Sequence, residues 1–318
     1  MTHYDVFNGD ADGLCALHQL RLAEPRDSVL VTGVKRDIAL LQRVLAEPGD
    51  TITVLDVSLD KNRDALHEVL AGGASVRYVD HHHPGEIPQH EHLDTHIDTD
   101  AAVCTGLLVD RLLEGRHRAW AVVAAFGDNL FDSAHAAAAS LSLQPADLDT
   151  LKELGTLLNY NGYGATLDDL LFDPADLYRR IAPYADPLDF VRDDEAFATL
   201  QRGYADDRAR VDALQPAHAG ETTALYQLPD AAWARRIGGV WANELAQGAP
   251  GRAHALLTER ADGAFVVSVR APLQARTGAD ELCNGFATGG GRKAAAGINR
   301  LLADEVERFT EAFVARYG

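Results

Sequence analysis

The chain has little cysteine, no long apolar run and no signal-like start. Its three cysteines, Cys15, Cys104 and Cys283, are far apart and odd in number. This usage argues against a disulfide framework and favours a reducing compartment. No uninterrupted apolar stretch approaches the ~20 residues that cross a bilayer, and no basic and apolar signal segment opens the sequence. We therefore expect a cytoplasmic protein without a membrane partner.

Basic residues are also scarce. The 318 residues include 29 Lys and Arg against 48 Asp and Glu, which gives a net charge of −19. A protein that binds long duplex DNA by neutralising many phosphates would be expected to carry a basic surface. Long duplex DNA is therefore not expected as the main partner. A short phosphate-bearing substrate, held by metal ions and a few local arginines, remains compatible with this charge.

Short apolar runs alternate with helical patterns in the first part of the chain. We predict strands at residues 2–7, 28–31, 51–55 and 76–79, and helices at 14–24, 38–45, 63–70 and 102–112. Alternation of this kind predicts βαβ crossovers and a doubly wound, mainly parallel α/β sheet. Residues 134–214 have helical periodicity and are expected to form a helical layer and connector.

Acidic clusters follow three of the predicted strands: residues 8–13 with Asp10 and Asp12, residues 55–58 with Asp56, and residues 78–85 with Asp80-His81-His82. A fourth cluster, residues 126–129 with Asp128, does not follow a predicted strand. Each cluster alone could be a helix N-cap or a turn. Because loops from different strands meet at the carboxyl edge of a parallel sheet, the four together favour one metal site. Carboxylates with imidazole suit Mn, Mg, Fe or Zn.

The first cluster has a rival interpretation. Asn8-x-Asp10-x-Asp12-Gly13 copies the first half of an EF-hand calcium loop. Gln19 stands where that loop needs a bidentate Glu, and the residues before it are typical of a strand rather than a helix. Calcium binding is therefore the less favoured alternative.

The four motifs, in this order, resemble those of the DHH phosphoesterase superfamily. The superfamily includes RecJ-type exonucleases, oligoribonucleases, 3′-phosphoadenosine phosphate phosphatases, cyclic-dinucleotide phosphodiesterases and family II pyrophosphatases. The resemblance implies Mn²⁺, one or two ions, with Mg²⁺ or another divalent metal possible. It implies that Asp12, Asp56, His81 and Asp128 hold one ion and that Asp56 bridges to a second ion held partly by Asp10.

Three consecutive histidines, His81 to His83, stand in the third cluster. His81 and His82 are adjacent, so on an extended backbone their rings should point in opposite directions. The resemblance implies that His82 faces the substrate phosphate, and Asp56, Asp80 and His82 are the catalytic candidates. His90, His92 and His96 are expected in a solvated loop.

The sequence departs from the family pattern at three positions. Many relatives have a histidine ligand four residues before Asp10, where this chain has Val6. The Asp10 site could therefore be weak, completed by Asn8, or absent. RecJ-type relatives often have Asp at position 8. The third departure is Arg292, which stands where relatives have a histidine in the glycine-rich signature of their second domain, called DHHA1.

A glycine-rich stretch marks the second half of the chain. Residues 286–297 are interpreted as a Gly-rich turn that opens an Ala-rich helix, whose N-terminus could bind an anion with help from Arg292 and Lys293. This stretch resembles the DHHA1 signature Gly-Gly-His-x-x-Ala-Ala-Gly, and Arg270 lies in a similar Ser-x-Arg strand. The predicted substrate-binding residues are Asn8, Arg270, Gly290, Gly291, Arg292 and Lys293.

The resemblance covers most of the chain and sets the expected domains. These are a DHH catalytic domain at 1–190, a helical linker at 191–219 and a smaller α/β DHHA1-like domain at 220–318. The predicted function is metal-dependent hydrolysis of phosphodiester or phosphomonoester bonds in short single-stranded oligonucleotides or small nucleotides. A 3′-phosphoadenosine phosphate phosphatase and a non-catalytic nucleotide sensor are the alternatives; the DHHA1-like end disfavours a pyrophosphatase. Relatives are commonly homodimers.

Overall fold

A computed structural model describes residues 1–318, and the chain divides into two compact units, Met1–Gly203 and Tyr204–Gly318. The helix α9 (Glu195–Asp212) crosses the boundary between them. None of the helices combines the length and the apolar character needed to span a bilayer. The three cysteines are buried and unpaired.

The first unit is built on a five-stranded sheet in which every neighbouring pair is parallel. The strand order is β2-β1-β3-β4-β5, with β1 at His3–Phe7, β2 at Val29–Val31, β3 at Thr51–Leu55, β4 at Ser75–Asp80 and β5 at Leu93–Ile97. The doubly wound parallel sheet predicted from the sequence is confirmed. The direction in which strands are added reverses between β1 and β3, and ligand sites of open α/β sheets lie at such a reversal, outside the carboxyl ends of the strands.

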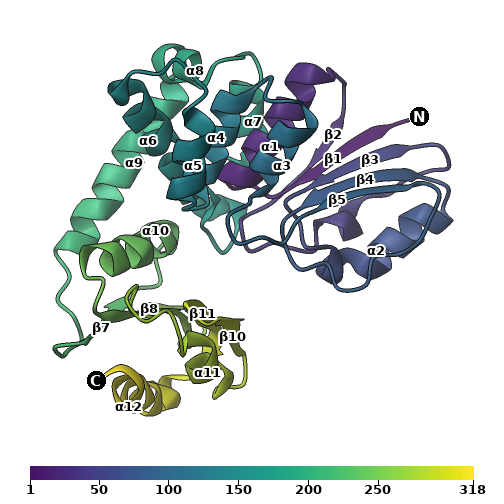
Figure 1. Cartoon of the computed structure of the whole chain (residues 1–318). Coiled ribbons are helices and arrows are strands. Elements are labelled where there is room, and N and C mark those ends of the chain that lie inside the picture. The colour runs from purple at the N-terminus through teal and green to yellow at the C-terminus, as the bar shows by residue number, and fades with distance from the viewer. The chain divides into compact units, whose positions relative to one another are not determined.

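Helices cover both faces of this sheet (Figure 1). On one face lie α2 (Leu59–Ala71) and the short 3-10 helix η1 (Leu40–Arg43), packed on apolar side chains of β1, β3 and β4. On the other lie α1 (Ala11–Ala23), α3 (Thr105–Leu112) and α4 (Arg118–Gly127). The remaining elements are α5 (Phe131–Ala138), α6 (Pro145–Gly162), η2 (Leu167–Asp169), α7 (Pro174–Ile181) and α8 (Pro187–Asp193).

Two local predictions in this unit are wrong. The helix expected at 38–45 is only η1, because the Asn62 side chain of α2 accepts from the Leu41 N–H and donates to the Ile38 carbonyl, replacing helical bonds. The histidine-rich loop contains β5, which includes His96. Only Leu93 and Ile97 of that edge strand are apolar, with three polar residues between them, and this weakens the apolar signal of a strand.

The second unit contains a six-stranded mixed sheet of order β10-β11-β9-β8-β7-β6. Its strands are β6 (His218–Ala219), β7 (Thr223–Leu228), β8 (Ala253–Glu259), β9 (Phe265–Arg270), β10 (Gly289–Arg292) and β11 (Ala295–Leu301), and only β7 and β8 pair in parallel. Its helices are α10 (Ala232–Gly248), α11 (Ala279–Asn284), η3 (Ala303–Glu305) and α12 (Val306–Tyr317). The smaller α/β unit predicted from the sequence is therefore present.

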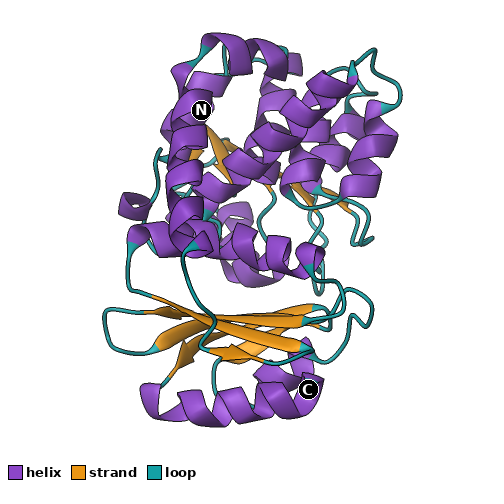
Figure 2. Cartoon of the chain, turned by 90° about the vertical axis from the view of Figure 1, so that its left-hand side faces the viewer, coloured by secondary structure: helices purple, strands orange, loops and turns teal.

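Alternation along the strands gives this sheet two apolar faces. Leu225 of β7 belongs to the core that contains Phe309 and Phe313 of α12, whereas the ring of its neighbour Tyr226 packs edge-on against Trp241 of α10. Successive strand residues point to opposite faces, so α10 and α12 cover different sides. Figure 2 shows the sheet with helices on both sides.

Candidate metal centre

The predicted metal ligands converge at the carboxyl edge of the parallel sheet. Asp12 lies in the first turn of α1, Asp56 directly after β3, His81 directly after β4, and Asp128 at the C-terminus of α4. The Nε2 atom of His81 is 3.4 Å from Asp56 Oδ1 and 4.0 Å from both Asp12 Oδ2 and Asp128 Oδ2. Three carboxylates from distant parts of the chain therefore face one imidazole nitrogen.

The other nitrogen of this imidazole is already engaged. His81 Nδ1 lies 3.0 Å from the carbonyl oxygen of Val103. A carbonyl can only accept, so Nδ1 carries the proton and Nε2 keeps its lone pair toward the carboxylates in the neutral ring. This is the arrangement in which a histidine binds a metal through Nε2.

Asp12 is oriented by the N-terminus of α3. The Thr105 N–H donates to Asp12 Oδ2 at 2.8 Å, and the Gly106 N–H donates to Asp12 Oδ1 at 2.7 Å. The Thr105 hydroxyl also donates to Asp56 Oδ1 at 3.2 Å. A Cβ at Gly106 would lie 2.4 Å from the Cβ of Ala124, so only glycine permits this close approach. No local pattern marks Thr105 or Gly106 in the sequence, because Asp12 lies 93 and 94 positions away from them.

The carboxylate of Asp56 is buried close to other acids. Its backbone has φ of 57°, a left-handed conformation that Asp tolerates better than most residues, and its side chain is buried. Burial, followed by the charges of Asp12 and Asp10, raises the pKa of Asp56 well above its usual value, against the opposing effect of His81. Repulsion among these acids costs the folded protein free energy that a bound cation would relieve.

Asp10 has a different environment from the other acids. Its Oδ1 accepts the Asp12 and Gly13 N–H groups and caps α1, and its Oδ2 lies 2.5 Å from Lys35 Nζ. Burial alone would raise the pKa of Asp10, but the Lys35 ammonium outweighs it and lowers this pKa. Lys35 was not identified from the sequence, where it is one basic residue in a loop between β2 and η1.

The side chain of Asn8, predicted to contact substrate or metal, is directed to the backbone instead. Its Oδ1 accepts from the Asp10 N–H at 3.3 Å, and its Nδ2 donates to the Lys35 carbonyl at 3.2 Å. These two bonds fix the loops that carry Asp10 and Lys35. The calcium-loop alternative is wrong, because strand β1 precedes this loop where an EF-hand has a helix.

The rings of His81 and His82 do not point in opposite directions as predicted. Their centroids are 4.5 Å apart, because the chain leaves the extended conformation after β4 ends at Asp80. His82 Nδ1 lies 2.7 Å from Asp80 Oδ1 and 3.9 Å from Asp56 Oδ1, and its side chain is 43% exposed. Asp80 is thus placed to orient His82, and Nε2 of this exposed ring is left to contact a ligand. The catalytic roles of Asp56, Asp80 and His82 stay predictions.

The Gly-rich turn of the second unit does not open a helix. Residues 289–292 and 295–301 instead form the antiparallel hairpin of β10 and β11. The small side chains allow close packing of strands: a Cβ on Gly291 would lie 2.5 Å from the Cα of Ala296, and one on Gly297 would lie 2.6 Å from the Val267 carbonyl oxygen. Strand pairing therefore overrides the high helix propensity of alanine.

The predicted substrate-binding residues of this unit lie on or beside that hairpin. Arg292 and Lys293 are exposed, and the position of a Cβ on Gly290 is open. Arg270 donates to Asn243 Oδ1 at 2.7 Å and to the Ser268 hydroxyl at 3.0 Å. The anion site at a helix N-terminus is thus wrong, and phosphate binding by these side chains stays a prediction.

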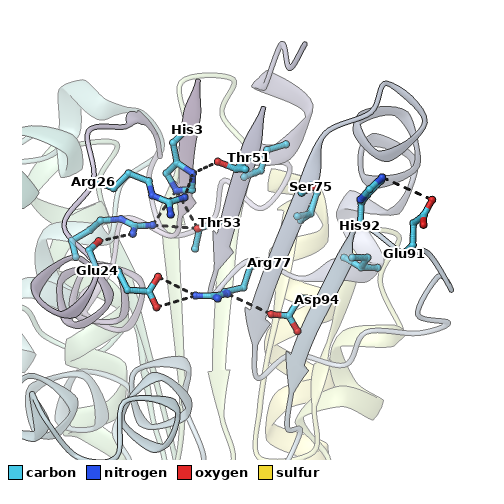
Figure 3. Close-up of a pocket in the computed structure, with 14 residues that line it drawn as sticks. His3, Glu24, Arg26, Thr51, Thr53, Ser75, Arg77, Glu91, His92 and Asp94 are labelled. Carbon is cyan, nitrogen blue, oxygen red and sulfur yellow. Dashed lines mark hydrogen bonds and ion pairs between the residues drawn. The ribbon is translucent and has the colours of Figure 1, made fainter. Parts of the chain in front are cut away.

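A separate pocket of about 320 Å³ lies at the amino ends of the parallel strands, away from the acidic cluster at their carboxyl ends (Figure 3). Its lining includes His3, Thr51 and Ser75, which stand at the amino ends of their strands. The Arg77 guanidinium in this pocket pairs with Glu24 and with Asp94. The pocket is therefore distinct from the acidic cluster, and Arg77 is already neutralised by acids.

The acidic cluster fits a divalent cation. Asp12, Asp56 and Asp128 offer carboxylate oxygens, and His81 offers the Nε2 nitrogen that faces them. A single ligand atom from each of Asp56, His81 and His82 can also be chosen so that all lie within 4.8 Å of one another. Oxygen with nitrogen donors suits Mn²⁺, Zn²⁺ or Fe²⁺.

Comparison with solved structures identifies the fold. A RecJ exonuclease bound to manganese matches with a TM-score of 0.62 and 17% identity, covering 100% of this chain and 91% of that one. The pGpG-specific phosphodiesterase PggH from Vibrio cholerae matches with a TM-score of 0.56 and 14% identity, over 99% and 98%. RecJ from Thermus thermophilus in complex with Mn²⁺ matches with a TM-score of 0.57 and 19% identity, over 99% of this chain and 51% of that one.

No protein-family model and no curated protein matches the sequence. The structural matches cover both units, although the chain spans only about half the length of the Thermus RecJ. The fold implied by the resemblance to the DHH phosphoesterase superfamily is therefore confirmed: the chain has the fold of RecJ and of PggH.

Proposed function

We propose that this protein is a divalent-metal-dependent phosphoesterase of the DHH type. The observation that carries the proposal is the convergence of Asp12, Asp56 and Asp128 on Nε2 of His81, while Nδ1 of that ring is fixed by Val103. These four side chains would hold Mn²⁺. A bound divalent ion supplies a water of lowered pKa and neutralises charge on phosphate oxygens.

The neighbouring residues have distinct tasks in this proposal. The backbone N–H groups of Thr105 and Gly106 hold Asp12 in place, and the Thr105 hydroxyl holds Asp56. Asp80 orients His82, whose exposed ring in its protonated form can donate a hydrogen bond from Nε2 to a phosphate oxygen or a proton to a leaving group. Geometry of this kind, fixed before the substrate binds, is what electrostatic catalysis requires.

The proposed substrates are short oligonucleotides and small nucleotides. The net charge of −19 disfavours long nucleic acid. Of the two proteins with this fold, one is named an exonuclease and the other a pGpG-specific phosphodiesterase. Because the match covers 98% of the dinucleotide phosphodiesterase, a linear dinucleotide is the first substrate to test.

The decisive experiment measures turnover with Mn²⁺. Purified protein would be incubated with pGpG, a longer single-stranded oligoribonucleotide, 3′-phosphoadenosine phosphate and bis-para-nitrophenyl phosphate. We expect hydrolysis of at least one, most rapidly of pGpG, and a loss of about 100-fold or more in the Asp56→Asn variant. No turnover of any of the four, with wild type as inactive as Asp56→Asn, would contradict the proposal.

A non-catalytic nucleotide sensor is the second candidate. Val6, where many relatives have a histidine ligand, is fully buried in the apolar core beside Leu40 and Val54 and cannot bind a metal. A sensor would bind one of the same nucleotides tightly and hydrolyse none.

A further inference from the structure

Lys35 lies inside the cluster of acids. Its Nζ is 2.5 Å from Asp10 Oδ2, 2.8 Å from Asn159 Oδ1 and 4.0 Å from Asp128 Oδ1. Its side chain is only 23% exposed, and the centroid of the Tyr163 ring lies 5.4 Å from Nζ. Three oxygens of hard-donor type therefore surround one ammonium group.

The backbone fixes Lys35 in this position. Its N–H donates to the Gly162 carbonyl at 2.8 Å, and its carbonyl accepts from Asn8 Nδ2 at 3.2 Å. The bond to Gly162 joins the loop of Lys35 to the end of α6, and the bond from Asn8 joins it to the loop after β1. The loop that carries Lys35 is thus held from both sides, and the side chain is positioned by more than its own ion pair.

The partners of Lys35 are the residues that would bind a second divalent ion. Asp10 is the predicted ligand of that ion, yet one of its oxygens caps α1 and the other contacts Lys35. The remaining candidate position, Val6, is a fully buried apolar side chain. A second divalent ion beside Asp10 would have to displace the ammonium or lie in contact with a like charge.

We propose that the ammonium of Lys35 takes the place of a second metal ion, so that the centre binds one divalent cation per chain and Lys35 supplies the neighbouring positive charge. This inference rests on the proposed metal centre of Asp12, Asp56, His81 and Asp128. Under this proposal no second ion lies beside Asp10, and Asp56 does not bridge two ions as the resemblance implies.

Lys35 has the means to contact a substrate as well. An ammonium group carries three N–H donors, and Asp10 and Asn159 accept two of them. Asp128 Oδ1, at 4.0 Å, is too far to accept the third. The third donor of this partly exposed group is available for a phosphate oxygen next to the metal-bound one. A fixed ammonium in this position would polarise the phosphate without needing a second ion.

The test counts bound Mn²⁺ by electron paramagnetic resonance, which distinguishes free, isolated and exchange-coupled ions. Wild-type protein titrated with Mn²⁺ should bind one ion per chain at this centre, with no exchange-coupled pair. Lys35→Ala removes the ammonium and leaves the oxygens of Asp10, Asn159 and Asp128, so it should bind two ions that are exchange-coupled. Lys35→Arg, which keeps the charge, should bind one.

Lys61→Ala is the matched control, because Lys61 is exposed and pairs only with Asp60. It should bind one ion. An exchange-coupled pair in wild type, or a single ion in Lys35→Ala, would overturn the role of Lys35 and leave the proposed phosphoesterase standing. No bound Mn²⁺ in wild type would overturn the metal centre itself. If Lys35→Ala fails to fold, the number of Mn²⁺ ions bound by the wild-type protein still tests the proposal.

Discussion

Nδ1 of His81 lies 3.0 Å from the carbonyl oxygen of Val103, in the segment that leads into α3. The N-terminus of the same helix binds Asp12 through Thr105 and Gly106. One short segment therefore orients both an imidazole and a carboxylate of the centre. The geometry of the site depends on α3 as much as on the strand ends.

His81→Ala should weaken Mn²⁺ binding by about 100-fold or more, because it removes the only nitrogen that faces Asp12, Asp56 and Asp128 together. The measurement is a Mn²⁺ titration followed by electron paramagnetic resonance. His83→Ala is the control: His83 is exposed, and its one hydrogen bond is local, with the Gly85 N–H. Equal affinities of the two variants would show that His81 is not a ligand.

Asp56→Asn should stabilise the metal-free protein by about 1–3 kcal/mol at neutral pH, while lowering turnover by about 100-fold or more. The raised pKa of Asp56 means that its ionisation at neutral pH opposes folding, and Asn removes that charge while tolerating the left-handed backbone at φ 57°. Denaturant unfolding in a metal chelator measures the change. A destabilised variant would contradict this and show that the contacts of the Asp56 carboxylate with Thr105 and His81 outweigh the repulsion from the other acids.

Asp5→Asn is the matched control and should have the opposite sign. Asp5 is as buried as Asp56, but hydrogen bonds from His3, Arg21 and Ser28 outweigh burial and lower the pKa of Asp5 to about 2. Its stabilisation is present above the unfolded pKa near 3.8 and is lost as pH falls toward 2. Neutralising Asp5 should cost about 2–4 kcal/mol at neutral pH, because Arg21 loses its buried partner.

The positions of Asp10, Asp12, Asp56 and Asp80 could be predicted from the sequence because each follows or ends an apolar run that predicts a strand. Strand ends gather at one edge of a parallel sheet. Lys35, Thr105 and Gly106 carry no such signal. Each acts on a residue 25 or more positions away, and only the packed chain brings the partners together.

The Gly-rich hairpin shows why local propensity fails. Ala295 and Ala296 favour a helix, yet their backbone pairs with β9 and β10, since the sheet supplies hydrogen bonds that an isolated turn cannot. The same small side chains that suggest a helix are those that allow strands to approach closely. Alanine and glycine runs therefore do not distinguish the two structures until the neighbouring strands are known.

Gly106→Ala should lower both stability and Mn²⁺ affinity. Its Cβ would meet the Cβ of Ala124 at 2.4 Å and Asp12 Oδ1 at 3.1 Å, so the start of α3 must shift away from Asp12. We expect about 1–3 kcal/mol of destabilisation and roughly a tenfold loss of affinity or more, as for other residues that orient a ligand. Gly248→Ala, with nothing within 4 Å of the new Cβ, is the control and should change neither by a comparable amount. Unchanged affinity in Gly106→Ala would show that α3 does not orient the centre.

Acid should destabilise the first unit through His18. Its ring is buried against Trp120, and its Nε2 donates to the Tyr184 carbonyl. Burial lowers the pKa of His18 to about 4, against a smaller opposing effect of the bond to Tyr184. The imidazole of His18 therefore takes up a proton near pH 6.5 in the unfolded chain but only near pH 4 in the folded chain.

The stabilisation from neutral His18 is complete above pH 6.5 and falls between pH 6.5 and 4 by up to about 1.4 kcal/mol per pH unit. Denaturant unfolding at several pH values measures this slope. His18→Gln, which can still donate to Tyr184, should be less stable at neutral pH but should lose less stability on acidification than wild type. His67→Gln, an exposed position on α2, should keep the wild-type slope. Identical slopes for all three proteins would mean that His18 gains its proton equally well in the folded and unfolded chain, and burial would then not control its titration.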